Sequence, residues 1–237
     1  MRIFNRLVPG MLAVVAATLI HGVAVAATPS ADIGKVRELF QARRFAELSS
    51  LLDRYQASCD RDIRNEFAVR DAFLAVAAGT PSAKALLDDW VEGAPRGSWV
   101  PLTARATCFL AIGRKARGVK PAAGAAAPRA ADANFLQAVD DLERSLKLMP
   151  RQLQGYLVLM EICQYLGDQE RGARVAKKAL ELYPKSYLIR HRRLTSLAPR
   201  WGGSYDAMER FARESAQFAD ANPRLRILAG MAPWDRG

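Results

Sequence analysis

His191 is the only histidine beyond the first 26 residues, so any acid–base reaction that needs an imidazole would have to use it. Its neighbours in the sequence are Arg190, Arg192 and Arg193. A general base of the serine-hydrolase kind needs a carboxylate to orient it, and this neighbourhood supplies cations instead. A single histidine also excludes a histidine-rich zinc site and a two-histidine mechanism. The pattern therefore favours a surface histidine over a catalytic one.

Adjacent carboxylates occur twice, as Asp88-Asp89 and Asp140-Asp141, and paired acids are a common arrangement for acid–base chemistry. Neighbouring residues on a helix diverge by about 100°, so neither pair can converge on one substrate. We expect all four to be charges on helix surfaces. The sequence also contains no C-x-x-C pair, phosphate-binding loop, dinucleotide fingerprint or G-x-S-x-G element. These observations predict a protein that is not an enzyme, with no metal and no cofactor.

Three cysteines, Cys59, Cys108 and Cys163, follow the first 26 residues. In an oxidising compartment an odd number permits one disulfide and leaves one thiol over. Each cysteine also stands among apolar residues, where a buried thiol behaves as a small hydrophobic side chain. A disulfide and free thiols are therefore both open interpretations, and no pairing is assigned.

The first 26 residues have the pattern of a signal peptide. Arg2 and Arg6 give a basic start, and an apolar run follows over Met11–Ile20. Ala24 and Ala26 then occupy the −3 and −1 positions of an A-x-A cleavage site. The apolar run is far shorter than the roughly 20 residues that span a bilayer, which argues against the alternative of an uncleaved membrane anchor. We expect cleavage after Ala26 and a periplasmic or secreted mature protein.

The chain stays basic without that segment. Its 35 Lys and Arg fall to 33 against 24 Asp and Glu, which leaves a net charge of about +9. Such a charge is typical of nucleic-acid binding, but export argues against that partner. An acidic protein or peptide fits the charge better, and contact with an anionic membrane surface is compatible with it. A merely solvated basic surface is the remaining alternative.

Helical periodicity runs through the rest of the chain, and no alternating strand pattern follows residue 30. We predict an all-α fold, with a fifth helix that begins near Ser98 and closes at Gly113. Residues 119–131 contain two prolines and a glycine but no large apolar side chain beyond Val119, which predicts a loop. The predicted organisation is a signal peptide (1–26), N-terminal helical hairpins (27–118), a flexible Ala/Pro/Gly loop (119–131), repeats (132–222) and a C-terminal cap (223–237).

A repeat of 34 residues is the strongest internal signal, because Ser145–Pro150 (S-L-K-L-M-P) recurs as Ala179–Pro184 (A-L-E-L-Y-P). That offset is the tetratricopeptide period, in which each unit is a helix–turn–helix. We predict a tetratricopeptide-like α-α superhelix of about five helical hairpins with a polar capping segment. The next interval, from Pro184 to Pro223, is 39 residues, which places an insertion in the last inter-helix turn.

The inserted stretch is Pro199–Ser204, P-R-W-G-G-S. Its proline can end one helix, its glycines permit unusual backbone angles, and Ser204 can cap the next helix. In a structural interpretation Trp201 packs over the hairpin as a plug, and Arg200 reaches the carbonyls that end the preceding helix. In a functional interpretation the exposed glycine N–H groups and Arg200 bind an anion or a peptide carboxylate.

The longer stretch Leu194–Ser204, L-T-S-L-A-P-R-W-G-G-S, resembles the hallmark of an uncharacterised bacterial family of tetratricopeptide-like proteins, a domain of unknown function. Trp90 before Pro95, and the pair Arg117-Gly118, are similar to further features of that family. The resemblance covers about residues 36–228. It implies a helical-repeat scaffold and supplies no catalytic residue.

Basic residues are concentrated between Asp168 and Arg193, a range with eight basic and three acidic residues. We expect this region to face a partner. The eight are Arg171, Arg174, Lys177, Lys178, Lys185, Arg190, Arg192 and Arg193. Glu170 is expected to form an ion pair with Arg174, and Glu181 with Lys177, because the members of each pair are four residues apart on a helix.

These observations predict a non-catalytic protein–protein interaction module. By analogy with tetratricopeptide domains, the first helices of the hairpins are expected to line a concave groove. The predicted contact residues are Arg200, Trp201, Gly202, Gly203 and Ser204 in the inserted loop, Gln154, Glu161, Gln164, Tyr165, His191 and Thr195 at the groove, and Arg190 in the basic region. A periplasmic enzyme of unrecognised type and an accessory or immunity subunit dedicated to one secreted protein are the alternatives.

Overall fold

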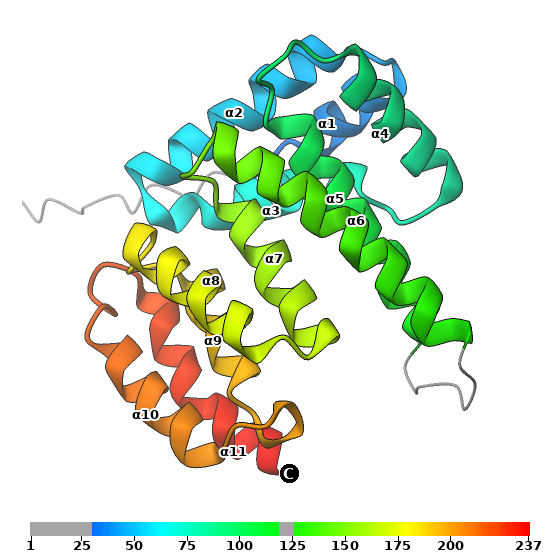
Figure 1. Cartoon of the computed structure of the whole chain (residues 1–237). Helices are drawn as coiled ribbons and strands as arrows, with labels where there is room; N and C mark the ends of the chain where they lie inside the picture. Colours follow the sequence, from blue (N-terminus) through cyan, green and yellow to red (C-terminus); the bar gives the residue numbers. More distant parts are fainter. Residues whose placement is uncertain (1–29, 119–125) are drawn as a thin grey trace, which may run out of the picture.

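The computed structural model describes residues 30–118 and 126–237, and in these ranges the chain is helical and contains no strand (Figure 1). The predicted all-α class is confirmed. No helix in the described ranges is both long and apolar enough to cross a membrane. The α-helices are α1 (Ile33–Gln41), α2 (Phe45–Arg61), α3 (Glu66–Val76), α4 (Pro81–Gly93), α5 (Val100–Arg117), α6 (Ala126–Leu148), α7 (Leu153–Leu166), α8 (Gln169–Leu182), α9 (Tyr187–Ser196), α10 (Tyr205–Ala216) and α11 (Met231–Arg236).

Most successive helices pack against one another, although α4 packs against α5 and not closely against α3, and α7 lies at the centre (Figure 1). It contacts α3, α5, α6, α8 and α9, so every residue from Leu153 to Cys163 is buried. The part of α7 that is buried on all sides cannot present one face to an open groove, whereas its last three residues, 164–166, are only partly buried. This packing buries several residues of α7 that were predicted to contact a partner.

The longest helix pair is α5 and α6, which lie side by side in Figure 1. Gly113 was expected to end α5, but α5 continues to Arg117. The reason for the glycine is close packing, since a Cβ atom at this position would lie 2.4 Å from Cε1 of the Phe135 ring. Gly113 therefore permits the approach of α6 and is not a stop signal.

The loop predicted over residues 119–131 is too long, because α6 begins at Ala126. Residues 119–125 lie outside the described ranges. Pro128 falls in the first turn of α6, where a missing N–H group costs nothing, and the surrounding alanines have the highest helix propensity. The predicted signal peptide also lies outside the described ranges.

Two helices of the C-terminal half have their N-termini capped by side chains of the N-terminal half. The Leu153 N–H, at the start of α7, donates to Gln56 Oε1 on α2 at 3.0 Å. The Leu188 N–H, in the first turn of α9, donates at 3.0 Å to a carboxylate oxygen of Glu66 at the start of α3. Glu66 is fully buried, and this burial raises the pKa of its carboxyl while its hydrogen bonds oppose the rise.

Asp141 corrects the expectation that all four paired carboxylates are surface charges. Its side chain is 4% exposed and accepts two hydrogen bonds from Arg105, each at 2.8 Å. Arg105 also contacts Asp88 at 3.2 Å, whereas Asp89 forms an ion pair with Arg43. Charge spacing along α6 could not reveal this contact, because the partner comes from α5.

All three cysteines are free and buried, which settles the open question in favour of free thiols. Burial raises the pKa of Cys163 to about 11 and raises those of Cys59 and Cys108 as well. A thiol that stays protonated is a poor nucleophile, so these side chains act as small core residues.

Candidate functional site

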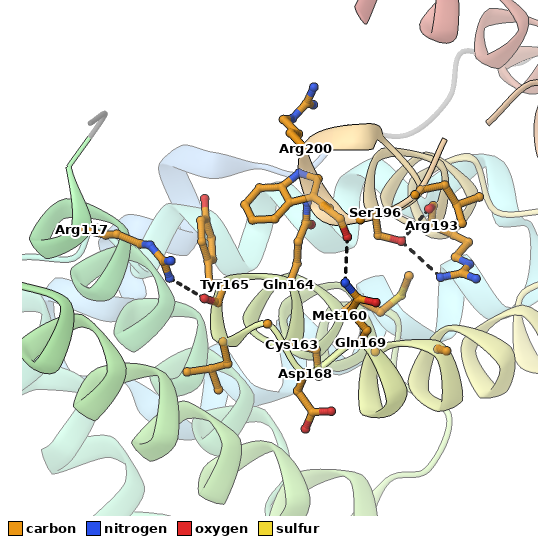
Figure 2. Close-up of a pocket in the computed structure, with 18 residues that line it drawn as sticks. Arg117, Met160, Cys163, Gln164, Tyr165, Asp168, Gln169, Arg193, Ser196 and Arg200 are labelled. Carbon is orange, nitrogen blue, oxygen red and sulfur yellow. Dashed lines mark hydrogen bonds between the residues drawn. The ribbon is translucent and has the colours of Figure 1, made fainter. Parts of the chain in front are cut away.

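A cavity of about 610 Å³ lies between the α7–α8 turn and the α9–α10 connection (Figure 2). We call it the cleft. α7 begins at Leu153 and α9 begins 34 residues later at Tyr187, and the turns that follow both helices line this cavity. The described residues that line the cleft are Arg117, Met160, Cys163, Gln164, Tyr165, Leu166, Gly167, Asp168, Gln169, Gly172, Ala173, Arg193, Ser196, Leu197, Arg200, Trp201, Gly202 and Gly203.

The α7–α8 turn forms one side of the cleft. Gly167 ends α7 in the left-handed conformation, with φ of 73°. The Asp168 carboxylate then caps α8 by accepting the Arg171 N–H at 2.9 Å. In Figure 2 this carboxylate lies on the side of the view opposite Arg200. Among the described residues, the one acid that lines the cleft is therefore already engaged by a helix terminus.

The α9–α10 connection forms the other side. It contains a single 3₁₀ turn, Pro199–Trp201, followed by Gly202 with φ of 83°. A Cβ atom on Gly203 would lie 2.0 Å from the Leu197 carbonyl oxygen, so only glycine fits there. Ser204 accepts the Ala207 N–H at 3.1 Å and caps α10, which confirms its predicted capping role and removes it from the cleft.

Trp201 joins the two sides. Its ring meets Tyr165 edge-on, with centroids 6.1 Å apart, and Tyr165 in turn stacks on Phe135 at 5.3 Å. The Trp201 carbonyl accepts a hydrogen bond from Gln169 Nε2 at 3.1 Å, drawn in Figure 2. Trp201 is only half-buried. It is therefore both a packing residue and part of the cleft wall.

Replacing Trp201 with alanine is expected to lower the free energy of unfolding by about 1.5 kcal/mol. This is roughly half the cost of truncating a fully buried tryptophan, because part of the ring already faces solvent. Urea unfolding measures it. Trp234→Ala is the matched control, since that ring is 80% exposed and its loss should change stability by less than about 0.5 kcal/mol. Equal effects of the two substitutions would show that Trp201 does not pack.

Arg200 neither reaches the carbonyls that end α9 nor is free to bind an anion, the two roles that the sequence suggested. Its guanidinium forms an ion pair with Asp235 on α11, and in Figure 2 it points away from the other labelled residues. The preceding helix does not need it for its last carbonyls, because backbone N–H groups of Leu197 and Ala198 reach them. This ion pair connects α11 to the loop.

Two other arginines flank the cleft. Arg117 donates to the Tyr165 carbonyl, and its guanidinium lies 5.6 Å from the centre of the Tyr165 ring. Arg193 contacts the Ser196 hydroxyl at 3.4 Å, and no ion pair engages it in the described part of the chain. Burial lowers the pKa of Arg193, since no carboxylate compensates for the loss of water.

Three predicted contact residues are buried in polar contacts and lie outside the cleft. Gln154 donates to the Thr107 hydroxyl at 3.3 Å, and Glu161 pairs with Arg192 at 2.7 Å. Arg190 is 3% exposed and donates to the Pro184 carbonyl at 2.7 Å. The predicted groove is absent along α7, because α3 and α5 cover the face that should have lined it.

His191 and Thr195 lie further along α9, also outside the cleft. His191 is half-buried and packs against Tyr187, with ring centroids 5.5 Å apart. Burial lowers the pKa of its imidazole, and the charges of Arg192 and Arg70 lower it further. The structure thus places cations beside His191, as its sequence neighbours suggested, although it is less exposed than a surface residue.

His191 should make the protein less stable at mildly acidic pH. The lowered pKa means that folding favours the neutral imidazole, so this contribution is complete above about pH 6.5 and is lost as the pH falls through the folded-state pKa. We expect the free energy of unfolding to fall between about pH 7.5 and about pH 5.5. His191→Gln should fall less over the same interval in urea titrations. Parallel pH profiles for the two proteins would contradict the assignment to His191.

The basic region between Asp168 and Arg193 is not a continuous cationic patch. Arg190 is buried, and most of the other cations are neutralised by neighbouring acids. The ion pairs are Arg171 with Glu143, Arg174 with Glu170, Lys178 with Glu181, and Arg192 with Glu161. The pair expected between Lys177 and Glu181 is formed by Lys178 instead. Arg193 remains as the cation of this region that lines the cleft.

Of the twelve predicted contact residues, the cleft brings together six: Gln164, Tyr165, Arg200, Trp201, Gly202 and Gly203. Sequence reasoning missed Gln169 and Ser196 and did not assign Arg117 to a site, although Arg117-Gly118 was noted as a family feature. The signal for Gln169 was available, because turns that are one repeat apart must lie near one another.

No catalytic arrangement is visible in the described residues. No three His, Cys, Asp or Glu side chains are grouped there so that they could hold a metal ion. The cleft offers no acid paired with a base, because Asp168 caps α8 and Cys163 stays protonated. Comparison with models of protein families, with curated proteins and with solved structures finds no match for this chain.

Proposed function

We propose that this chain is an exported, non-catalytic scaffold of tetratricopeptide-like hairpins that binds a segment of a partner protein in the cleft. The observation that carries the proposal is the cleft itself. Its volume of about 610 Å³ falls within the roughly 300–1,000 Å³ of ordinary ligand sites, and it has an apolar floor with a few polar groups at its edge.

The helical arrangement supports the repeat architecture. The starts of α7 and α9 are separated by the 34 residues of the sequence repeat, and α5, α7 and α9 pack in succession. We propose that the hairpins are α1–α2, α3–α4, α5–α6, α7–α8 and α9–α10, in which α4 packs mainly against α5, followed by a cap formed by Pro223–Gly230 and α11. The loop at Pro199–Ser204, whose glycines are required by its backbone, supports membership of the family that the sequence resembles.

Location in the periplasm rests on the basic, apolar and A-x-A pattern of the first 26 residues. N-terminal sequencing of the protein recovered from the producing cell tests it. A start at or near Ala27 is expected, and a retained Met1 would contradict export with cleavage.

The binding role is tested by photo-cross-linking from inside the cleft. A benzophenone amino acid in place of Ala173, an exposed residue of α8 that lines the cleft, is expected to trap a defined cross-linked partner in the producing cell. The same replacement at Ala133 is the matched control, because this alanine is exposed on α6 and lies outside the cleft. Trapping of a partner from position 173 alone supports the proposal. The same products from both positions, or none from either, would contradict it.

The number of trapped species also separates two kinds of scaffold. A single stoichiometric partner supports the accessory-subunit role, in which the chain serves one secreted protein. Several partners that share a sequence feature support a general adaptor.

A further inference from the structure

We propose that the cleft selects an acidic segment, with a carboxylate bound at Arg193 and a neighbouring apolar or aromatic side chain seated on the cleft floor. This inference rests on the proposed binding role of the cleft and adds the chemical class of its occupant.

The charges around the cleft are the first argument. In the described part of the chain, Arg117, Arg193 and Arg200 line it, against a single acid, Asp168. Arg200 is neutralised by Asp235, and the Asp168 carboxylate is held by the start of α8. The remaining formal charges, on Arg117 and Arg193, are both positive. A cationic rim around an apolar cavity is complementary to an anionic group attached to an apolar one.

Arg193 is the second argument. It is only partly exposed, and in the described part of the chain its guanidinium donates to the neutral Ser196 hydroxyl at 3.4 Å. Loss of water without a counter-charge is unfavourable for a guanidinium, and the pKa of Arg193 is accordingly lowered. Its neighbour Arg192 differs, because a carboxylate of Glu161 lies 2.7 Å away. A ligand carboxylate would give Arg193 the partner that the fold gives Arg192.

The floor of the cleft is the third argument. Met160 and Cys163 of α7 and Leu197 of the connection line it, and Tyr165 and Trp201 form the wall. Methionine and aromatic side chains adapt to apolar groups of different shapes. Such a surface gives little affinity for an anion alone, such as phosphate. It fits a peptide in which an acidic residue stands next to an apolar one.

Selection from a random peptide library tests this class directly. The full-length protein is expected to enrich peptides that combine Asp or Glu with Phe, Trp, Leu or Met. For the best selected peptide, replacing its acids with the corresponding amides should weaken binding at least about tenfold, as expected for loss of a charge-assisted hydrogen bond. Affinity should also fall as salt is raised.

Two variants with the same change of charge separate the site from general attraction. Arg193→Gln should weaken the selected peptide about tenfold. Lys177→Gln should leave its affinity within about twofold, because Lys177 is exposed on α8 and does not line the cleft. Circular dichroism and urea unfolding establish that both variants fold like the parent.

Three results would overturn the inference: no enrichment of Asp and Glu, equal binding of the acidic and amide peptides, or equal losses in the two variants. If position 173 still traps a partner in any of these cases, the scaffold role stands and the acidic class is wrong. If position 173 traps nothing, the scaffold role fails with it.

Discussion

Glu66→Ala is expected to lower the free energy of unfolding by about 4 kcal/mol, because this substitution leaves several buried donors without an acceptor. The donors are the N–H groups of Tyr187 and Leu188, the Ser186 hydroxyl and the Asn222 side-chain amide. Glu66→Gln should cost about half as much, since it keeps one oxygen but turns an NH₂ group toward the remaining donors. Urea unfolding of each variant measures the difference from the parent protein.

Glu47→Ala is the matched control for this experiment. Glu47 also forms hydrogen bonds, with Arg44, but its side chain is 55% exposed. Its removal should leave the free energy of unfolding close to that of the parent protein, because exposed ion pairs contribute little to stability. If Glu66→Ala were as stable as Glu47→Ala, the carboxylate of Glu66 would not hold the start of α9.

Arg105→Ala is expected to cost about 3–5 kcal/mol, because it leaves the carboxylate of Asp141 buried without a counter-charge. Arg144→Ala is a control on the same carboxylate. Arg144 approaches Asp141 at 3.8 Å, but its side chain is 62% exposed, so its removal should cost less than about 0.5 kcal/mol.

A double substitution identifies the cause of the Arg105 effect. Arg105→Met combined with Asp141→Leu removes both charges and keeps apolar volume in the interface of α5 and α6. Much of the stability lost in Arg105→Ala should return, because no buried charge is left unpaired. A double variant that is as unstable as Arg105→Ala would show that packing of the arginine stem, and not the charge of Asp141, is the cause.

Local patterns in the sequence were sufficient to predict the helical class and the position of the important loop. The 34-residue spacing of the S-L-K-L-M-P and A-L-E-L-Y-P segments matches the separation of the starts of α7 and α9. The cap at Ser204 was also predictable, because it depends only on residues within one turn. These features can be read from the types and spacing of residues along the chain, without knowledge of which helices pack together.

The absence of a groove along α7 was not predictable, for the opposite reason. Gln154 and Glu161 have the polarity of exposed residues, and no local pattern shows that α3 and α5 cover them. Asp141 is equally ordinary in sequence, since its partner Arg105 lies 36 residues away. The number of neighbours around α7 is a property of the whole packed chain.

The capping of α7 and α9 by Gln56 and Glu66 has a consequence for how this protein can fold and evolve. In a simple solenoid each unit touches only its neighbours, so units can be added, lost or melted one at a time. Here hydrogen bonds join residues 97 and 122 positions apart. The C-terminal helices α7 and α9 therefore depend on α2 and α3, and the molecule should unfold as one cooperative unit. Insertion of an additional helix pair between the two halves would pull these caps out of reach, so the number of helices between them is constrained.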